Sequence, residues 1–257
     1  MTTTTGLGFG RGFDERQPVI VLLDTSASMN RPAHSPRIAE LNRALAGWFD
    51  SVRSKPQLLA RVEVCLIAFD ERVRIYDTVA GGFRAPQQAD GDAVFAPLAG
   101  LRPPELPAAG CSCLVPAVRL ALELAQRRRQ ELTDRGLPVV RPVIWLLTDG
   151  APSDEWGTAL DAGQLASTAA ELRQAEQEDG CAFFVVGVRG ADQELLKVLA
   201  PWSTHMLENL DFSQILSLLL ASSDRLEPGR TIKETYTDVA HDADRARILN
   251  ELEEDYL

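Results

Sequence analysis

The sequence predicts an α/β fold: a doubly wound, mostly parallel sheet flanked by helices, with one antiparallel edge strand. Two runs, VIVLL at 19–23 and VIWLL at 143–147, are apolar without alternation, which is typical of strands that are buried on both faces. Segments with a helical spacing of apolar residues separate the predicted strands along the chain. Because parallel strands need long crossover connections, this alternation favours a parallel sheet covered by helices on both faces.

The predicted helices differ in how clearly they are delimited. The first, at 37–54, follows Ser35 and Pro36, which are a favourable N-cap residue and a favourable first helical residue. A second amphipathic helix is predicted from Leu114 to about Leu132. The other expected helices are a polar one at about 163–178, a short one at 192–200 and a last one at 212–223.

The remaining predicted strands are shorter or more polar. Residues 61–70 and 72–80 predict two strands that pair as a hairpin at one edge of the sheet. CAFFVVGV at 181–188 predicts another buried strand, and 204–209 a weak one. Residues 80–110 are rich in Gly, Pro and Ala, which predicts a long irregular connection of the kind that is often functional.

Composition divides the chain into three parts. Residues 1–17 are rich in Thr and then in Gly, and predict a flexible N-terminal arm. One domain is expected at 18–223. Residues 224–257 form an acidic C-terminal tail, in which 243–257 could form a short helix.

Charge and composition exclude several classes of protein. The net charge of -11 argues against a nucleic-acid-binding protein, because phosphate neutralisation needs a basic face. No stretch approaches the roughly 18 apolar residues of a membrane span and no signal peptide is recognisable, so we expect a cytoplasmic protein without membrane contact. A zinc site is not expected, because the three histidines are far apart in the sequence. Cys111 and Cys113 are either a redox pair or two small residues.

Oxygen-bearing side chains follow the two buried strands. Asp24, Ser26 and Ser28 come at alternate positions after the first strand, and Asp149 comes after the second. In open α/β sheets, ligands bind beyond the carboxyl ends of the strands, where neighbouring connections diverge. If the two strands are neighbours, two carboxylates converge, and they repel each other unless a proton or a cation lies between them. An oxygen-only donor set favours Mg2+ or Mn2+.

Capping chemistry explains residues 24–28 equally well when they are taken alone, because hydroxyls there could satisfy backbone amides before the next helix. Three further features favour a metal site: the buried strand upstream, the second strand that ends in Thr148-Asp149-Gly150, and Ser112 just before a helix. The predicted metal ligands are therefore Asp24, Ser26, Ser28, Ser112 and Asp149.

The stretch DTSAS at 24–28, with Thr148-Asp149-Gly150 about 125 residues later, resembles the metal-ion-dependent adhesion site (MIDAS) of von Willebrand factor A (vWA) domains. The resemblance covers about 18–223 and implies a vWA/Rossmann-like fold. In that family the two serines ligate the ion directly, and the aspartates bind it directly or through water. This pattern carries over to Asp24, Ser26, Ser28 and Asp149.

The third loop departs from the vWA pattern. The family usually has Gly-Gly-Thr there, and the Thr adds an oxygen ligand, whereas this chain has Gly110-Cys111-Ser112, which keeps a hydroxyl. Within the family, LLDTSASM and LLTDGAPSDEW are similar to the TerY-like branch, which is associated with tellurium resistance and stress. Resemblance to that branch implies a cytosolic, bacterial-type interaction module that in some systems accompanies a protein kinase and a phosphatase.

The predicted function is a non-catalytic protein–protein interaction module, in which the bound cation docks an Asp or Glu of a partner. The segments 80–109 and 151–156 are the expected rim of the docking site. One alternative is a metal-dependent hydrolase or phosphoryl-transfer enzyme, which would need a base, a charge clamp and usually more metal ligands. The other is a metal-independent scaffold that uses the acidic tail.

Two charged segments have more than one interpretation. The tail residues Glu251, Glu253, Glu254 and Asp255 could contact a partner or reach the metal as internal ligands. The basic run 127–129 could offset the dipole of its own helix or bind a partner.

Overall fold

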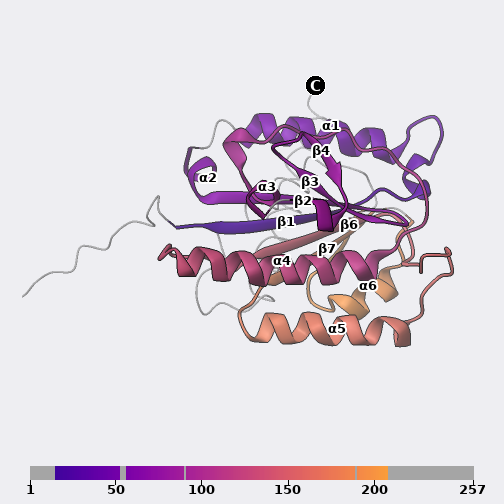
Figure 1. Ribbon diagram of the computed structural model, residues 1–257. Helices are drawn as coiled ribbons and strands as arrows, with labels where there is room; N and C mark the ends of the chain where they lie inside the picture. The colour runs from indigo at the N-terminus through magenta and orange to yellow at the C-terminus, as the bar shows by residue number, and fades with distance from the viewer. Residues whose placement is uncertain (1–14, 53–55, 90, 189, 208–257) are drawn as a thin grey trace, which may run out of the picture.

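The computed structural model describes residues 15–52, 56–89, 91–188 and 190–207, and Figure 1 shows how they are arranged. The predicted helix at 212–223, the acidic tail and most of the predicted arm lie outside the described residues. The strands are β1 (Gln17–Asp24), β2 (Val62–Phe69), β3 (Val73–Asp77), β4 (Gly82–Arg84), β5 (Ala96–Pro97), β6 (Val143–Thr148), β7 (Ala182–Val188) and β8 (Thr204–Leu207). The helices are α1 (Arg37–Val52), α2 (Pro56–Arg61), α3 (Gly91–Val94), α4 (Leu114–Asp134), α5 (Ala162–Gln177) and α6 (Gln193–Leu199), with 3-10 turns η1 (Ala27–Asn30), η2 (Pro86–Gln88) and η3 (Leu98–Gly100).

The described strands form one eight-stranded sheet in the order β4-β3-β2-β1-β6-β7-β8, with β5 beside β2. The central strand β1 pairs in parallel with β2 on one side and with β6 on the other. β7 and β8 continue the parallel arrangement beyond β6. The predicted doubly wound, mostly parallel sheet is thus confirmed.

The antiparallel edge contains more strands than the one predicted from the sequence. β3 pairs with β2 and β4 pairs with β3, both antiparallel, and the short β5 adds a second antiparallel contact to β2. The segment predicted as irregular, 80–110, supplies β4, β5 and three single turns. These elements are two to four residues long, so they are too short to show a hydrophobic period in the sequence.

Each face of the sheet has its own hydrophobic core. On one face, β-strand residues such as Val21 pack with Leu45 and Phe49 of α1. On the other face, residues such as Leu22 pack with Val118 of α4 and with the apolar sides of α5 and α6. Figure 1 accordingly shows α1 on one side of the sheet and α4, α5 and α6 on the other.

Within the described ranges, no helix has the length and apolarity that crossing a membrane requires.

This layering places the switch point of the sheet between β1 and β6. The chain leaves β1 toward α1 on one face, whereas it leaves β6 toward α5 on the other. Two neighbouring parallel strands whose connections diverge leave a crevice beyond their carboxyl ends, which is where ligands bind in open α/β sheets.

The basic run at the end of α4 makes intramolecular contacts. The side chain of Arg128 is buried, pairs with Glu63 at 2.7 Å and with Glu131 at 3.2 Å, and lies over the ring of Phe95. Arg129 donates a hydrogen bond to a backbone carbonyl before β7. Arg128 is therefore a structural residue and not part of an exposed basic surface.

Glu176 near the end of α5 is a half-buried carboxyl group with one fixed partner. Its Oε1 accepts the backbone N–H of Phe183 at 3.1 Å. Burial raises the pKa of Glu176 from 4.5 to about 7, although this hydrogen bond and the charges of Arg141 and Arg173 act in the opposite direction. The folded protein therefore binds this proton more tightly than the unfolded chain does.

Replacing Glu176 with Gln is expected to flatten the pH dependence of stability. Because the folded pKa is raised, the contribution of Glu176 is present in full below pH 4.5 and is lost as the pH rises through about 7. Glu176→Gln is neutral at every pH and keeps an oxygen for Phe183, so it should be more stable than the native chain at pH 8 by about 1–3 kcal/mol. Urea unfolding at a series of pH values measures this, with the exposed Glu178→Gln as control; parallel curves for native chain and variant would contradict it.

Candidate metal centre

All five predicted ligands lie together at the carboxyl ends of two adjacent strands. Asp24 is the last residue of β1, and Asp149 follows β6 directly. Ser26 and Ser28 lie where β1 continues into η1, and Ser112 lies just before α4. The convergence follows from the parallel pairing of β1 with β6, which brings both strand exits to one edge of the sheet.

The carboxylate of Asp24 joins three segments of the chain. Asp24 is fully buried, and its Oδ1 accepts the backbone N–H of Ser26 at 2.9 Å. Its Oδ2 accepts the hydroxyls of Thr148 at 2.6 Å and of Ser112 at 2.9 Å. Burial raises the pKa of Asp24, hydrogen bonds from Ser26 and Thr148 lower it, and the charge of Asp149 raises it further. A buried carboxylate in this situation is stabilised in its charged form by a nearby cation.

The two serines connect this carboxylate to the second one. The hydroxyls of Ser26 and Ser28 are 2.9 Å apart, and either can be the donor. Ser28 donates its hydroxyl hydrogen to Oδ1 of Asp149 at 2.6 Å. Asp149 is 2% exposed, so the second carboxylate is also withdrawn from solvent. The result is a continuous row of oxygen atoms across the gap between the two strand ends.

The loop before α4 holds Ser112 in place through a reciprocal contact. The backbone N–H of Ser112 donates to Oγ of Ser153 at 3.0 Å, and the N–H of Ser153 donates to the carbonyl of Ser112 at 2.8 Å. Gly110 has φ of +72°, and a Cβ there would lie 3.2 Å from the backbone nitrogen of Glu71. The Gly110-Cys111-Ser112 sequence thus keeps a glycine where the backbone requires one.

Arg37 is a site residue that the sequence interpretation missed. It is the first residue of α1, and its Nη1 lies 2.8 Å from Oδ2 of Asp149 and 3.5 Å from the carbonyl of Ser28. Its side chain is 14% exposed. A cationic side chain is unfavourable in the first turn of a helix, where the helix dipole is also positive. The position of Arg37 at the start of the predicted helix was therefore the one sequence signal that this residue has another role.

The donor set fits a hard divalent cation. It consists of two carboxylates and three hydroxyls, and Mg2+ and Mn2+ prefer such oxygen ligands. No group of three or more His, Cys, Asp or Glu side chains suited to a metal occurs in the part of the chain that the structure describes. Any metal held at the centre would therefore depend on the serine hydroxyls as well as on Asp24 and Asp149.

The two cysteines beside Ser112 are free thiols. Their sulfur atoms are 3.7 Å apart, and Cys113 is 4% exposed whereas Cys111 is more accessible. Burial, together with the neighbouring Cys111 thiol, raises the pKa of Cys113 to about 12. Cys65 and Cys181 are buried, and burial raises the pKa of each thiol.

We expect a thiol titration of the folded protein at pH 8 to find one fast group. Cys111 should react first with an aromatic disulfide reagent, because the other three thiols are buried and the thiolate is the reactive form. The remaining groups should react only after unfolding in urea. A Cys111→Ser variant, which should lose the fast phase, identifies the group. Two fast groups of equal rate would contradict the expectation and support a reactive Cys111–Cys113 pair.

Comparisons with known proteins bear on the fold. No protein-family model matches the chain, and no curated protein matches it. Among solved structures, the pilus adhesin SpaC from Lactobacillus rhamnosus GG matches with a TM-score of 0.53 at 14% identity, over 82% of this chain and 30% of that one. A von Willebrand factor type A protein from Catenulispora acidiphila matches with a TM-score of 0.46 at 16% identity, over 80% of this chain and 43% of that one.

Proximal thread matrix protein 1 from the mussel byssus matches with a TM-score of 0.48 at 15% identity, over 83% of this chain and 47% of that one. One structure of that mussel protein has a zinc-occupied MIDAS motif. The chain spans about half or less of the length of these three proteins. At 14% identity, the likeness to SpaC concerns the fold alone.

Proposed function

We propose that this chain is a non-catalytic protein–protein interaction module that holds a divalent cation, Mg2+ or Mn2+, at a MIDAS-type centre and docks an acidic residue of a partner. The observation that carries the proposal is the convergence of Asp24, Ser26, Ser28, Ser112 and Asp149 at the switch point of the sheet, within one hydrogen-bonded network. Its resemblance to the vWA motif adds the role of the ion as a docking point.

The carboxylates and the hydroxyls of the protein would have different roles at this centre. Asp24 and Asp149 supply the negative charge, and their burial keeps water from weakening their attraction for a cation. Ser26, Ser28 and Ser112 supply neutral oxygens, so the ion keeps positive charge for an incoming ligand. When bound, the cation would supply an open coordination position for a partner carboxylate, which is a directional, charge-assisted contact.

The polar network favours docking over catalysis. The hydroxyls of Ser28 and Ser112 donate to carboxylates of the centre, and within the described residues neither has a histidine partner that would activate it as a nucleophile. Among the described residues, no third carboxylate joins Asp24 and Asp149 to build a second metal position. A metal-dependent hydrolase or phosphoryl-transfer enzyme would need groups of these kinds.

The proposal also includes a cellular setting. The similarity of LLDTSASM and LLTDGAPSDEW to the TerY-like branch supports a bacterial stress or tellurium-resistance-type system, with a kinase or phosphatase of that system as a candidate partner. The four free thiols fit a reducing cytoplasm, where disulfides are rare.

One observation favours a second candidate, an interaction module that works without metal. The oxygens of both carboxylates already have protein donors: Ser26, Thr148 and Ser112 for Asp24, and Ser28 and Arg37 for Asp149. In that case the acidic tail or another surface would make the partner contact. A metal-dependent capture experiment separates the two candidates.

The tagged chain should be used to recover partners from lysate of its source cells, in Mg2+ and in chelator. Partners that bind in Mg2+, and that are lost both in chelator and with the Ser26→Ala/Ser28→Ala variant, would support ion-mediated docking. Ser167→Ala is a control, because Ser167 is an exposed serine of α5 whose hydroxyl bonds to Glu171, away from the centre. If the same partners bind in chelator and to the double variant, docking is independent of metal.

A further inference from the structure

Two hollows flank the metal centre on opposite faces of the sheet. One, of about 690 Å³, lies on the α1 side and is lined by the loop before α1 and its first turn. The other, of about 390 Å³, lies on the side of α4 and α5 and is lined by residues of the loops before both helices. They belong to opposite faces, because α1 packs on one hydrophobic core and α4 and α5 pack on the other.

Both hollows adjoin the metal centre directly. Arg37 lines the α1-side hollow and also contacts Asp149 at 2.8 Å. Cys113 and Ser153 line the other hollow, and Ser153 is paired through its hydroxyl and backbone with Ser112. A partner segment that lies across the ion can therefore contact both hollows.

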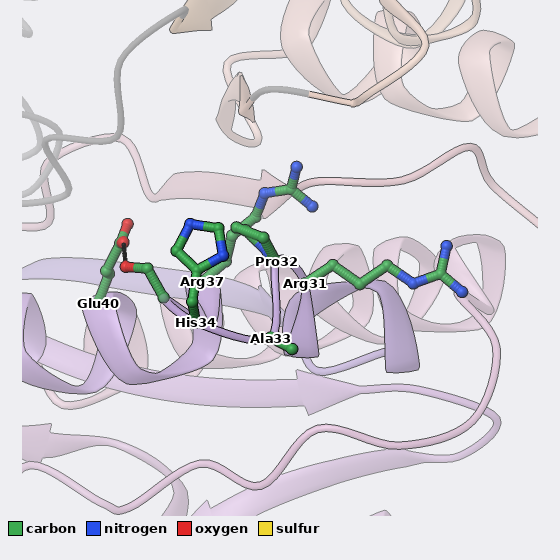
Figure 2. Close-up of a pocket in the computed structure, with 7 residues that line it drawn as sticks. Arg31, Pro32, Ala33, His34, Arg37 and Glu40 are labelled. Carbon is green, nitrogen blue, oxygen red and sulfur yellow. Dashed lines mark hydrogen bonds between the residues drawn. The ribbon is translucent and has the colours of Figure 1, made fainter.

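The α1-side hollow presents basic groups. Arg31 and His34 are exposed, and neither side chain has a hydrogen bond or ion pair within the described ranges. Figure 2 shows the Arg31 side chain extending away from the loop, in a different direction from the Arg37 side chain. Among the described residues of the lining, the one carboxylate is that of Glu40, which accepts the hydroxyl of Ser35 at 2.6 Å and lies at the opposite end of the hollow from Arg31.

The hollow on the side of α4 and α5 presents apolar and acidic groups instead. Its apolar lining includes Val115 and Leu160, together with Trp156, which is 81% exposed. Its carboxylates include Asp154 and the exposed Glu155 on the loop before α5. A third, Glu71, is exposed and pairs at 3.7 Å with the exposed Arg72, a contact that solvent weakens.

We infer that the docking surface is polarised across the metal centre, and that it takes a peptide segment with a matching order of charges. This inference rests on the proposed function. The segment carries its docking Asp or Glu over the ion, a further acidic residue on the α1 side, and an apolar residue followed by Lys or Arg on the side of α4 and α5. Charge complementarity of this kind sets the orientation of a partner more than its affinity.

The side chains that line each hollow account for the proposed order of charges in the peptide segment. An acidic residue over Arg31 pairs with an exposed guanidinium, which can bind a carboxylate through two hydrogen bonds. On the other side, an apolar side chain covers Trp156, and an arginine or lysine can bury its stem there while its charge faces Glu155. The exposed indole ring adds a favourable surface for that cation.

Four synthetic fluorescent peptides test the inference with the full chain in Mg2+. Each peptide has a central Asp between glycines. In the two polarised peptides, Glu-Asp precedes the centre and Leu-Arg follows it, or the reverse. In the two symmetric peptides, either Glu-Asp or Leu-Arg stands on both sides. Fluorescence anisotropy should show that one of the two polarised peptides binds about tenfold more tightly than both symmetric peptides. Two polarised peptides are needed because either chain direction is compatible with the surface.

Charge-reversal variants locate the contacts. Arg31→Glu and Glu155→Lys should each weaken binding of the preferred peptide about tenfold, and Arg31→Glu should favour the peptide with Leu-Arg on both sides. Arg43→Glu and Glu123→Lys are matched controls, because both residues are exposed on α1 and α4 and line neither hollow. Thermal unfolding of all four variants excludes a loss of fold as the cause.

The outcomes separate this inference from the proposed function. Equal binding of all four peptides, binding of none, or equal effects of the test and control variants would overturn the polarised surface. If chelator abolishes binding while the order of charges has no effect, ion-mediated docking stands and the inference fails. If the order of charges matters but chelator has no effect, the polarised surface is supported and the role of the ion fails.

Discussion

The double variant Ser26→Ala/Ser28→Ala is expected to abolish the response of the folded protein to Mg2+ and Mn2+. These two hydroxyls supply the neutral oxygens between Asp24 and Asp149, and their 2.9 Å separation links the two carboxylates. Without them the site keeps its charge but loses two oxygen ligands. Mg2+ dehydrates reluctantly and demands near-octahedral geometry, so fewer protein ligands in place should weaken its binding strongly. Isothermal titration calorimetry should show binding to the native chain and none to the variant.

Thermal unfolding gives an independent measurement. A ligand that binds only the folded state stabilises it by about 2.7 kcal/mol at a concentration of 100 times its Kd, which raises the Tm of a domain of this size by several degrees. The variant also loses the hydrogen bond from Ser28 to Asp149, so its Tm without metal should fall as well. The relevant quantity is therefore the difference in Tm between metal and chelator, and not the absolute Tm.

Controls make this result specific to the centre. Ser35→Ala removes a hydroxyl from the same loop and should keep the full metal response. Calcium and zinc, tested beside Mg2+ and Mn2+, show which ion the centre prefers. A native chain whose Tm is the same in Mg2+, in Mn2+ and in chelator would contradict the metal centre and leave the metal-independent module as the explanation.

The sequence predicted the positions of Asp24 and Asp149 because those positions follow from strand pairing. An apolar run without alternation indicates a strand that is buried on both faces, and a parallel pair of such strands brings its two exits to the same edge. Once β1 and β6 are neighbours, an aspartate at each exit must lie near the other. For these two aspartates, the sequence therefore left open only whether the two strands are neighbours.

Arg37 could not be predicted in this way because strand pairing does not determine where its side chain points. It contacts Asp149, which is 112 residues away, through a long side chain whose direction depends on how α1 lies over the sheet. The same limit applies to β5, whose two residues pair with β2 across a long loop. In both cases the contact is set by tertiary packing, which leaves no periodic pattern in the sequence.

Replacing Arg37 with Ala is expected to change stability and metal affinity in opposite directions. The guanidinium lies 2.8 Å from Oδ2 of Asp149, whose side chain is fully buried. Removing it leaves a buried carboxylate without its cationic partner, which should lower the free energy of unfolding in chelator by about 2–4 kcal/mol. Within the described residues, a bound divalent cation would then be the one strong positive charge in contact with Asp149.

For the same reason, the affinity of Arg37→Ala for Mn2+ should rise about tenfold or more. In the native chain an arriving ion must share Asp149 with a guanidinium of like charge, and that repulsion opposes binding. In saturating Mn2+ the variant should therefore recover part of the stability that it lacks in chelator. Urea unfolding with and without Mn2+, combined with calorimetric titration of the metal, measures both effects on one preparation.

Two variants distinguish loss of charge from loss of packing. Arg37→Met keeps most of the apolar stem, so it should show the same gain in Mn2+ affinity as Arg37→Ala with a smaller loss of stability. Arg31→Ala removes a neighbouring guanidinium that does not contact Asp149, so it should change neither quantity by more than a small amount. Weaker Mn2+ binding in Arg37→Ala and Arg37→Met would reverse the interpretation, because Arg37 would then hold Asp149 in the orientation that the ion needs.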